Sequence, residues 1–243
     1  MVTATMAAVA RRLGGRVDPN RPLSDSRVRP PDIATLARPT SAVAEAHRSL
    51  RLTIERVARS EPVRSLLLVS PDDDRGRSGV VVNLAAAYAL AGMRSVAVDA
   101  DLRRPSLHTL FGVPNDRGLT DMLGDPDSPV FAISTAHERL SIVPSGQPIP
   151  SPSDALDSGF AGVRDRLLAN ADMLVIDCAP VLVAPDAVAL AGCVDAVVLV
   201  LAAGTTGRAH AAKARTILDR AGARVIGAIV TGVDSEPGPY SAR

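Results

Sequence analysis

The chain has 243 residues, a hydrophobic fraction of 47%, a charged fraction of 22% and a formal net charge of +1. This length can bury a substantial core and fits one large α/β domain or a domain preceded by an arm. Aromatic residues make up only 2% of the chain and Trp is absent, so no stacking platform and no nucleic-acid partner are expected. No apolar run approaches about 18 residues and no signal-peptide pattern opens the chain, so we expect neither a membrane-spanning helix nor a secretory leader.

The first part of the chain is basic and rich in proline. Four prolines between residues 22 and 39 break any long helix, so residues 1–40 are predicted to be an arm or linker, with one short helix over Ala4–Leu13. Residues 1–64 hold 12 Arg against 6 acidic residues, whereas the remainder holds 15 basic and 20 acidic residues. Such an arm suits an anionic membrane surface or an acidic partner, and a solvated leader fits the same composition.

From residue 41 onward the pattern becomes regular. Ser41 is a plausible N-cap for a helix over 41–58, and short apolar runs alternate with helical patterns from residue 65. Strands are expected over 65–70, 95–99, 140–144, 173–177, 196–201 and 225–231, and helices near 79–91, 105–111, 119–123, 153–169, 185–192 and 207–221. Near-continuous Val, Leu and Ile runs are typical of strands covered on both faces. We therefore predict a doubly wound, mostly parallel α/β sheet over residues 41–234, with helices on both faces and a tail over 235–243.

A modified phosphate-binding loop follows the first predicted strand. The segment Ser70–Val80, SPDDDRGRSGV, lies between a strand and a helix, as a P-loop requires, but Gly-Arg-Ser at 76–78 stands where the motif has Gly-Lys-Ser. Arginine keeps the positive charge, but its guanidinium is longer and planar and cannot take the place of the compact lysine ammonium without displacing another group. An aspartate of the run 72–74 would cost about 4 kcal/mol at about 4 Å from a phosphate, and far less if it faced outward. The loop therefore predicts weak or absent ATP binding.

Acidic residues end two other predicted strands. Asp99 and Asp101 end one buried strand in the run VAVDADLRRP, and Asp177 ends another. In an open α/β sheet, ligands bind beyond the carboxyl ends of the strands, where paired carboxylates can hold Mg²⁺ or activate an attacking hydroxyl. An isolated pair of this kind could instead cap the following helix or pair with Arg103. Asp186, farther along the chain, is expected to cap a helix rather than touch a ligand.

Several motifs in one order give the chain a family resemblance. The matching segments are E-x-x-R-x-x-R at 45–51, an acidic Walker A′ pattern with a D-L-R-R-P continuation from 96, the stretches 118–123 and 144–156, and a Walker B strand ending at 177. Together they resemble the cytoplasmic domain of bacterial tyrosine kinases (BY-kinases) and their capsule and exopolysaccharide chain-length relatives. These belong to the wider class of chromosome-partitioning and septum-site ATPases. The resemblance covers about residues 41–234.

The resemblance implies roles for individual residues, with ATP and Mg²⁺ as the ligands. The implied sets are Gly76, Arg77, Ser78 and Gly79 for the nucleotide; Ser78, Asp99 and Asp177 for the metal; Asp99 and Asp101 for catalysis; and Glu45, Arg48 and Arg51 for subunit contacts in a ring. The kinases usually end in a tyrosine cluster that neighbouring subunits phosphorylate. In this tail Tyr240 is the one candidate phosphosite.

The departures from the family pattern are concentrated at the nucleotide. Family loops look like S-P-x-P-G-E-G-K-S-T, and the family's later V-L-N, whose Asn reads adenine in related ATPases, is replaced here by Val230-Thr231. We therefore expect a cytoplasmic protein, peripheral at the inner face of the plasma membrane, that regulates polysaccharide chain length and export with a membrane chain-length partner. An active protein-tyrosine autokinase is the main alternative. A positioning ATPase is a third, which the motif at 45–51 disfavours.

Overall fold

The computed structural model describes residues 33–59, 61–73 and 76–233, and its strands form one seven-stranded sheet. The strands are β1 (Ser65–Val69), β2 (Ser95–Ala100), β3 (Ile133–Ser134), β4 (Leu140–Val143), β5 (Met173–Cys178), β6 (Ala196–Ala202) and β7 (Val225–Thr231). Their order across the sheet is β3-β4-β2-β5-β1-β6-β7. All neighbouring pairs are parallel except β3 with β4. The predicted mostly parallel sheet is confirmed.

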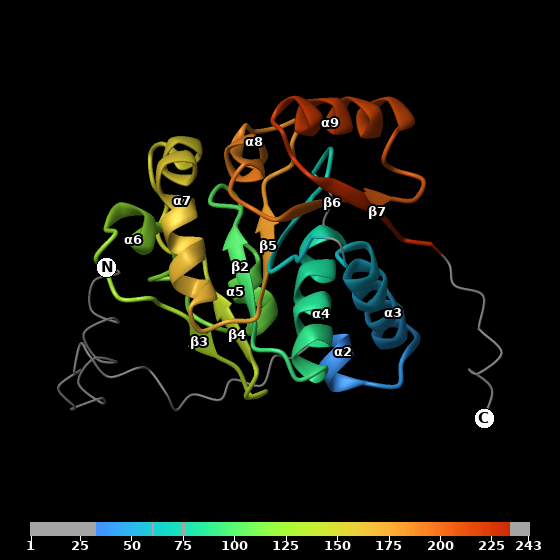
Figure 1. Ribbon diagram of the computed structural model, residues 1–243, viewed down its shortest axis with the longest axis horizontal. Coiled ribbons are helices and arrows are strands. Elements are labelled where there is room, and N and C mark those ends of the chain that lie inside the picture. Colours follow the sequence, from blue (N-terminus) through green and yellow to red (C-terminus); the bar gives the residue numbers. More distant parts are fainter. Residues whose placement is uncertain (1–32, 60, 74–75, 234–243) are drawn as a thin grey trace, which may run out of the picture.

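Helices cover both faces of this sheet (Figure 1). They are α2 (Ala34–Ala37), α3 (Ala42–Val57), α4 (Gly76–Leu90), α5 (Leu107–Phe111), α6 (Leu119–Gly124), α7 (Pro152–Leu168), α8 (Asp186–Ala191) and α9 (Arg208–Arg220). Successive side chains of a strand point to opposite faces. Leu66 and Leu68 of β1 therefore share a core with α3, α4 and α5, whereas Leu67 and Val69 share the other core with α6, α7, α8 and α9.

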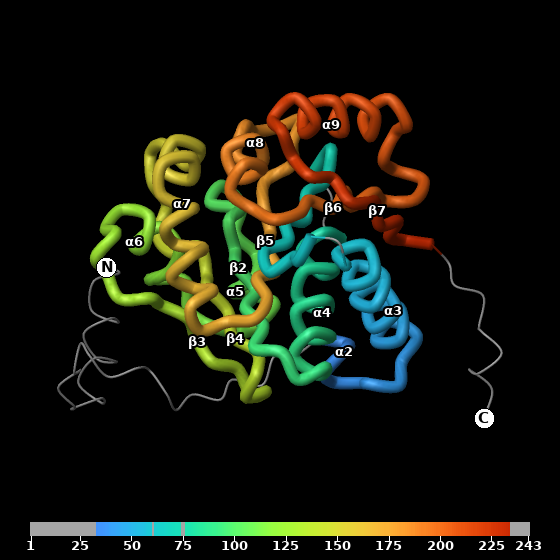
Figure 2. Tube along the Cα trace, viewed as in Figure 1, coloured from blue at the N-terminus to red at the C-terminus, as the bar shows by residue number. Residues whose placement is uncertain are grey.

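Two short elements, α2 and β3, were not predicted. Helix α2 packs beside α3 and α4, which the chain trace in Figure 2 shows as neighbours. The backbone N–H and the hydroxyl of Thr35 both donate to Asn83 Oδ1, at 2.9 and 2.8 Å, and Ile33 is buried. Residues 33–37, which the sequence assigns to the arm, are thus packed against the domain. The helix predicted over Ala4–Leu13 lies outside the described residues.

Most predicted boundaries agree with the structure to within two residues, and α4 is the exception. It begins at Gly76, three residues before the predicted start, so the residues at the lysine position belong to the first helical turn. The capping role predicted for Asp186 is wrong, because this residue is the first of α8 and its side chain makes no capping hydrogen bond. Its buried carboxylate instead accepts hydrogen bonds from Arg103 and Ser153. In the part of the chain that the structure describes, no helix has the length and apolar character needed to cross a membrane.

Candidate nucleotide site

The carboxyl ends of β1, β2 and β5 bring the predicted site residues together. Strand β5 lies between β1 and β2, and the sheet register pairs Asp177 with Asp99 on one side and with Leu68 on the other. The loop to α4 follows β1, and Asp101 follows β2. Parallel strands share one carboxyl edge, and Figure 1 shows that α4 lies beside these strands. The side chains meet near the start of α4, where Arg77 and Ser78 bond to Asp101 and Asp177.

Arg77 lies at the centre of this cluster. Its side chain is 5% exposed, and its three contacts are Nη1 to Ser70 Oγ at 3.0 Å, Nη2 to Asp101 Oδ2 at 2.9 Å, and Nε to Asp177 Oδ1. Burial alone would lower the pKa of Arg77, but the charges of Asp177 and Asp101 outweigh burial and raise it, so the guanidinium stays charged. The arginine that stands at the lysine position is therefore directed into the protein and held by its carboxylates.

Asp177 uses both of its carboxylate oxygens within the protein. Oδ1 accepts from Arg77 and from the backbone N–H of Cys178 at 3.1 Å, and Oδ2 accepts from the Ser78 hydroxyl. The Ser78 oxygen in turn accepts from the hydroxyl of Ser106 at 2.9 Å. Burial raises the pKa of Asp177, while the nearby Arg77 charge opposes that rise. Both oxygens of Asp177 are thus engaged in hydrogen bonds.

Asp99 differs from Asp177 because no cationic side chain of the described residues is hydrogen-bonded to it. Its Oδ2 accepts from the backbone N–H groups of Ser106 at 3.0 Å and Leu107 at 2.9 Å, at the start of α5. Its Oδ1 is buried and has no hydrogen-bond partner among the described residues. Burial raises the pKa of Asp99 well above its usual range and the charge of Asp177 adds to the rise, against the two backbone hydrogen bonds. Asp99 is the carboxyl group of the cluster with an open, buried oxygen.

The structure distinguishes two alternatives for Asp99 and Asp101, which are capping of the following helix and pairing with Arg103. Asp99 does bind the first turn of the helix that follows it, as a capping acid would, and Asp101 Oδ1 accepts from the backbone N–H of Arg104 at 3.0 Å. Neither acid pairs with Arg103, whose guanidinium instead binds Asp186. The pair therefore has a structural role in addition to its position in the site.

The described aspartates of the loop face outward. Asp73 is 63% exposed and pairs with Arg104, and Asp72 contacts His210 Nδ1 at 2.8 Å. Exposed charges are screened by solvent and salt, so these two acids would repel a phosphate far less than a buried acid would. The argument for weak nucleotide binding consequently depends on Arg77 more than on the aspartate run.

The cluster does not fit a divalent cation as it is arranged. The resemblance assigns the metal to Ser78, Asp99 and Asp177, and the structure does bring these three side chains together. However, Ser78 and Asp177 bind each other and Arg77 occupies Asp177 Oδ1, so their oxygens are already engaged. Across the described ranges, no group of three or more His, Cys, Asp or Glu side chains is placed to hold a metal ion.

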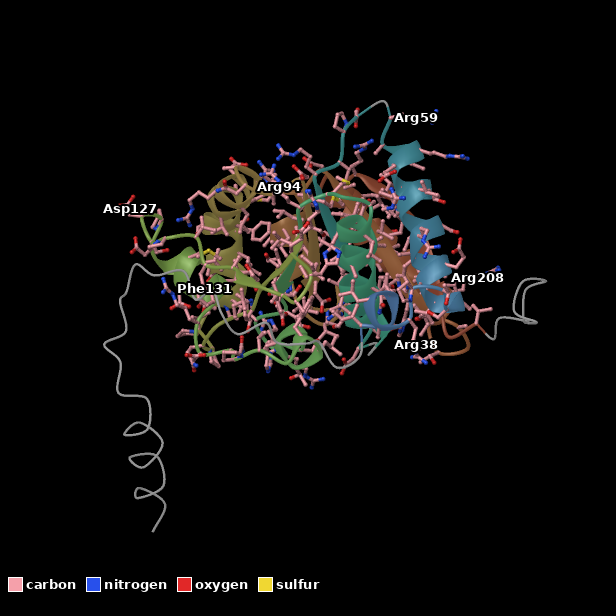
Figure 3. The ribbon with its side chains drawn as sticks, turned by 90° about the horizontal axis from the view of Figure 1, so that it is seen from below. Arg38, Arg59, Arg94, Asp127, Phe131 and Arg208 are labelled. Carbon is pink, nitrogen blue, oxygen red and sulfur yellow. The ribbon has the colours of Figure 1, made fainter. Side chains whose placement is uncertain are left out.

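The remaining predicted residues lie away from the cluster or outside the described ranges. Gly79 has open space where a Cβ would be, so its position does not require glycine. On α3, Arg48 pairs with Glu45 and also donates to the carbonyl of Pro39 at 2.7 Å, while Arg51 pairs with Glu55 at 2.6 Å. Figure 3 shows α3 at the edge of the molecule, with Arg38 near one end and Arg59 near the other.

The predicted phosphosite Tyr240 lies outside the described residues. Two residues of the site, Ser70 and Ser106, could not be assigned from motifs. Ser70 directly follows β1 and accepts a hydrogen bond from Arg77, and its position at the end of a strand is the sequence signal that points to the site. Ser106 carries no local motif, and only the packing of α5 against the loop reveals its contact with Ser78.

The fold and the site define an α/β domain of the P-loop type, and comparison with known proteins identifies its family. The chain is 32% identical over 203 residues to the tyrosine-protein kinase YwqD of Bacillus subtilis. The aligned region covers 83% of this chain and 86% of that relative. No model of a known protein family matches the chain. The chain therefore belongs to the family of bacterial tyrosine-protein kinases, as the motifs predicted.

Solved structures agree with this assignment. The chimerical protein CapA2B2 is similar with a TM-score of 0.77 and 31% identity, covering 82% of this chain and 88% of that one. The kinase domain of the Escherichia coli tyrosine kinase ETK has a TM-score of 0.78 and covers 89% of this chain and 88% of that domain. At 24% identity, this second likeness shows a shared fold.

Proposed function

We propose that this chain is a weakly nucleotide-binding member of the kinase family that regulates polysaccharide chain length in capsule or exopolysaccharide assembly and export. The observation that carries the proposal is that Arg77, at the sequence position of the P-loop lysine, has its guanidinium held by Asp101 and Asp177. To bind phosphate there, the guanidinium must leave two buried carboxylates. Breaking a buried ion pair costs about 3–5 kcal/mol, which is about two to three decades of affinity.

In this proposal the protein works at the inner face of the plasma membrane, with a membrane polysaccharide chain-length protein as its partner. Self-association through Glu45, Arg48 and Arg51 is part of the same proposal. Support comes from the exposure of Arg48 and Glu45, whose side chains are 43% and 64% accessible. Charges at the edge of a helix can exchange an intrachain partner for one on a neighbouring copy at little cost, because exposed pairs contribute about 0–1 kcal/mol.

An active autokinase is the second candidate, and the open oxygen of Asp99 favours it. In that activity the γ-phosphate of ATP would pass to a tyrosine of a neighbouring copy, for which Tyr240 is the candidate. A general base must accept the proton of the attacking hydroxyl, and a pKa raised toward the working pH suits that task. Asp99 has such a raised pKa because it is buried beside Asp177, and its Oδ1 has no partner among the described residues.

Calorimetric titration of the purified chain with ATP, with and without Mg²⁺, tests the proposal. We expect weak or undetectable heat of binding in both conditions. Micromolar, Mg²⁺-dependent binding that Asp177→Ala abolishes would contradict the proposal and favour the autokinase. Detection of phosphotyrosine on the chain after incubation with ATP, compared with Tyr240→Phe, then separates a kinase from an enzyme that only hydrolyses ATP.

A further inference from the structure

The helices α7, α8 and α9 form a layer that carries opposite charges on its two sides. All three pack on the same face of the sheet, and the shortest, α8, lies between the other two (Figure 1). Helix α7 connects β4 to β5, and α9 connects β6 to β7. Because these strands run in one direction, both helices begin at the carboxyl edge of the sheet and are parallel to each other.

The exposed side of α7 is acidic. Asp154 and Asp157 are exposed, and the ion pair of this helix joins Arg164 to Asp165, so neither acid has a cationic partner among the described residues. Arg164 also donates to the carbonyl of Cys193, just after α8, at 2.5 Å. Asp157 and Arg164 are two turns apart and thus share one side of the helix. The contact with Cys193 directs that side toward α8.

The exposed side of α9 is basic. Arg208, Lys213 and Arg220 are exposed, and none of them forms an ion pair within the part of the chain that the structure describes. His210 contacts Asp72 in the loop after β1 at 2.8 Å, and α8 packs on β1 whereas α9 packs on β7. Lys213 lies one turn after His210 on the same side of the helix. Its ammonium group is therefore on the side of α9 that faces α8.

The charges of the two helices lie at matching heights. With a rise of about 1.5 Å per residue, Asp157 lies about 7.5 Å along α7, and Lys213 lies about 7.5 Å along α9. Asp154 and Arg208 both lie within about 3 Å of the start of their helices. If α7 of one copy is placed on α9 of a second copy in the same direction, each acid therefore faces a base.

The middle of the layer can be approached closely by another helix layer. Val183, just before α8, is 67% exposed, and Val188 on α8 is 39% exposed. The exposed positions between the charges are small residues, namely Ser158, Ala161 and Gly162 on α7 and Ala209, Ala212 and Thr216 on α9. The distance between packed helices depends on the side chains at their contact, so small residues allow a short one. The two valines would then be removed from water.

We propose that the α7–α8–α9 layer is a docking surface for a second copy of this chain, related to the first by a two-fold axis that passes over α8 parallel to α7 and α9. About this axis, α7 of each copy lies on α9 of the other, so every contact occurs twice. An axis perpendicular to the helices would place α7 on α7 and α9 on α9, where like charges repel. The net charge of +1 adds little repulsion between copies.

This surface is distinct from the self-association that the proposed function assigns to α3. Helix α3 packs on the opposite face of the sheet, so the two contacts use different sides of the molecule. The α7–α8–α9 contact also involves no residue of the nucleotide site and does not depend on the proposed function.

Sedimentation velocity without nucleotide tests the proposal. We expect a concentration-dependent dimer that weakens between about 0.1 and 1 M salt, because the screening length falls from about 10 to 3 Å. Arg208→Glu/Lys213→Glu and Asp154→Lys/Asp157→Lys should each weaken the dimer at least about a hundredfold, since each puts like charges together at both copies of the contact. A wild type that stays monomeric at its highest soluble concentration would overturn the proposal.

A control variant separates this surface from α3 and from overall charge. Arg56→Glu/Arg59→Glu reverses two exposed arginines at the end of α3 and changes the net charge as much as Arg208→Glu/Lys213→Glu does. The dimer of this control should be as stable as that of the wild type. An equal loss in the control would overturn the assignment to the α7–α8–α9 layer.

Mixing the two charge-reversed variants gives the sharpest result. In their heterodimer, the introduced acids on α9 of one variant face the introduced lysines on α7 of the other, and the native charges of the remaining two helices also meet. The equal mixture should therefore form dimers, although each variant alone is monomeric. A mixture that stays monomeric, while circular dichroism shows both variants folded, would overturn the proposal whatever the outcome of the nucleotide experiments.

Discussion

Replacing Arg77 by Met removes the guanidinium while keeping much of the side-chain volume and a good helix former in α4. The loss should be large because Asp101 and Asp177 are 5% and 0% exposed, so water cannot take the place of the cation. Removing one partner of a buried ion pair costs about 3–5 kcal/mol, against a total stability of about 5–15 kcal/mol. Burial already raises the pKa of Asp177 and the variant loses the opposing charge, so protonation should reduce the cost as the pH falls.

Urea unfolding followed by circular dichroism measures this cost, and Asp177→Asn completes a double-mutant cycle. We expect Arg77→Met to lose about 3 kcal/mol near neutral pH and the double variant to lose about 2 kcal/mol less than the two single losses added together. Contacting residues show such coupling, whereas independent sites add to within about 0.5 kcal/mol. Additive losses, or a variant Arg77→Met as stable as the parent, would refute the assignment of the ion pair.

Four further substitutions test other parts of the structure. The folded-state pKa of Asp99 is raised, so the stability that this group contributes is complete below about pH 4 and is lost as the pH rises through the folded value. Asp99→Asn should therefore gain stability in urea relative to the parent as the pH rises. A difference that does not change with pH would contradict this. Gly146 has φ +85° and a Cβ there would lie 2.3 Å from Thr120 Oγ1, so Gly146→Ala should cost more than about 1 kcal/mol in thermal unfolding. Gly162→Ala, in open space on α7, should gain about 0.5–1 kcal/mol, and a loss at both glycines would count against the packing described. Arg103→Ala leaves the buried Asp186 carboxylate without its cation and should cost about 1–3 kcal/mol in urea unfolding, whereas no measurable cost would mean that the pair is not formed.

The sheet and most helices could be predicted because their apolar patterns are long and regular. The run from Ser65 to Val69 is buried on both faces, and such continuous apolar strands indicate a covered parallel sheet. Helix α2 has four residues and β3 has two, which is too short for any periodicity to be read. Their positions depend on tertiary contacts such as that between Thr35 and Asn83.

The types of residue in the site could be predicted, but the directions of their side chains could not. The order of the motifs was enough to place Asp99, Asp101 and Asp177 at one edge of the sheet. The sequence indicates that Arg77 departs from the motif but does not show where its guanidinium lies. The direction of a long side chain depends on the buried charges near it, which the motif does not give. For the same reason, the outward direction of Asp73 depends on Arg104, which lies 31 residues away in the chain.

The Nε–H group of Arg77 gives the most direct test of the central claim that the guanidinium holds the buried carboxylates. In nuclear magnetic resonance spectra of the isotope-labelled chain, a buried Nε–H bonded to Asp177 should give a slowly exchanging signal. This signal should be absent in Arg77→Lys, shifted in Asp177→Asn and unchanged when MgCl₂ is added. An Arg77 signal that exchanges as fast as those of exposed arginines, or that Mg²⁺ alone releases, would contradict the account.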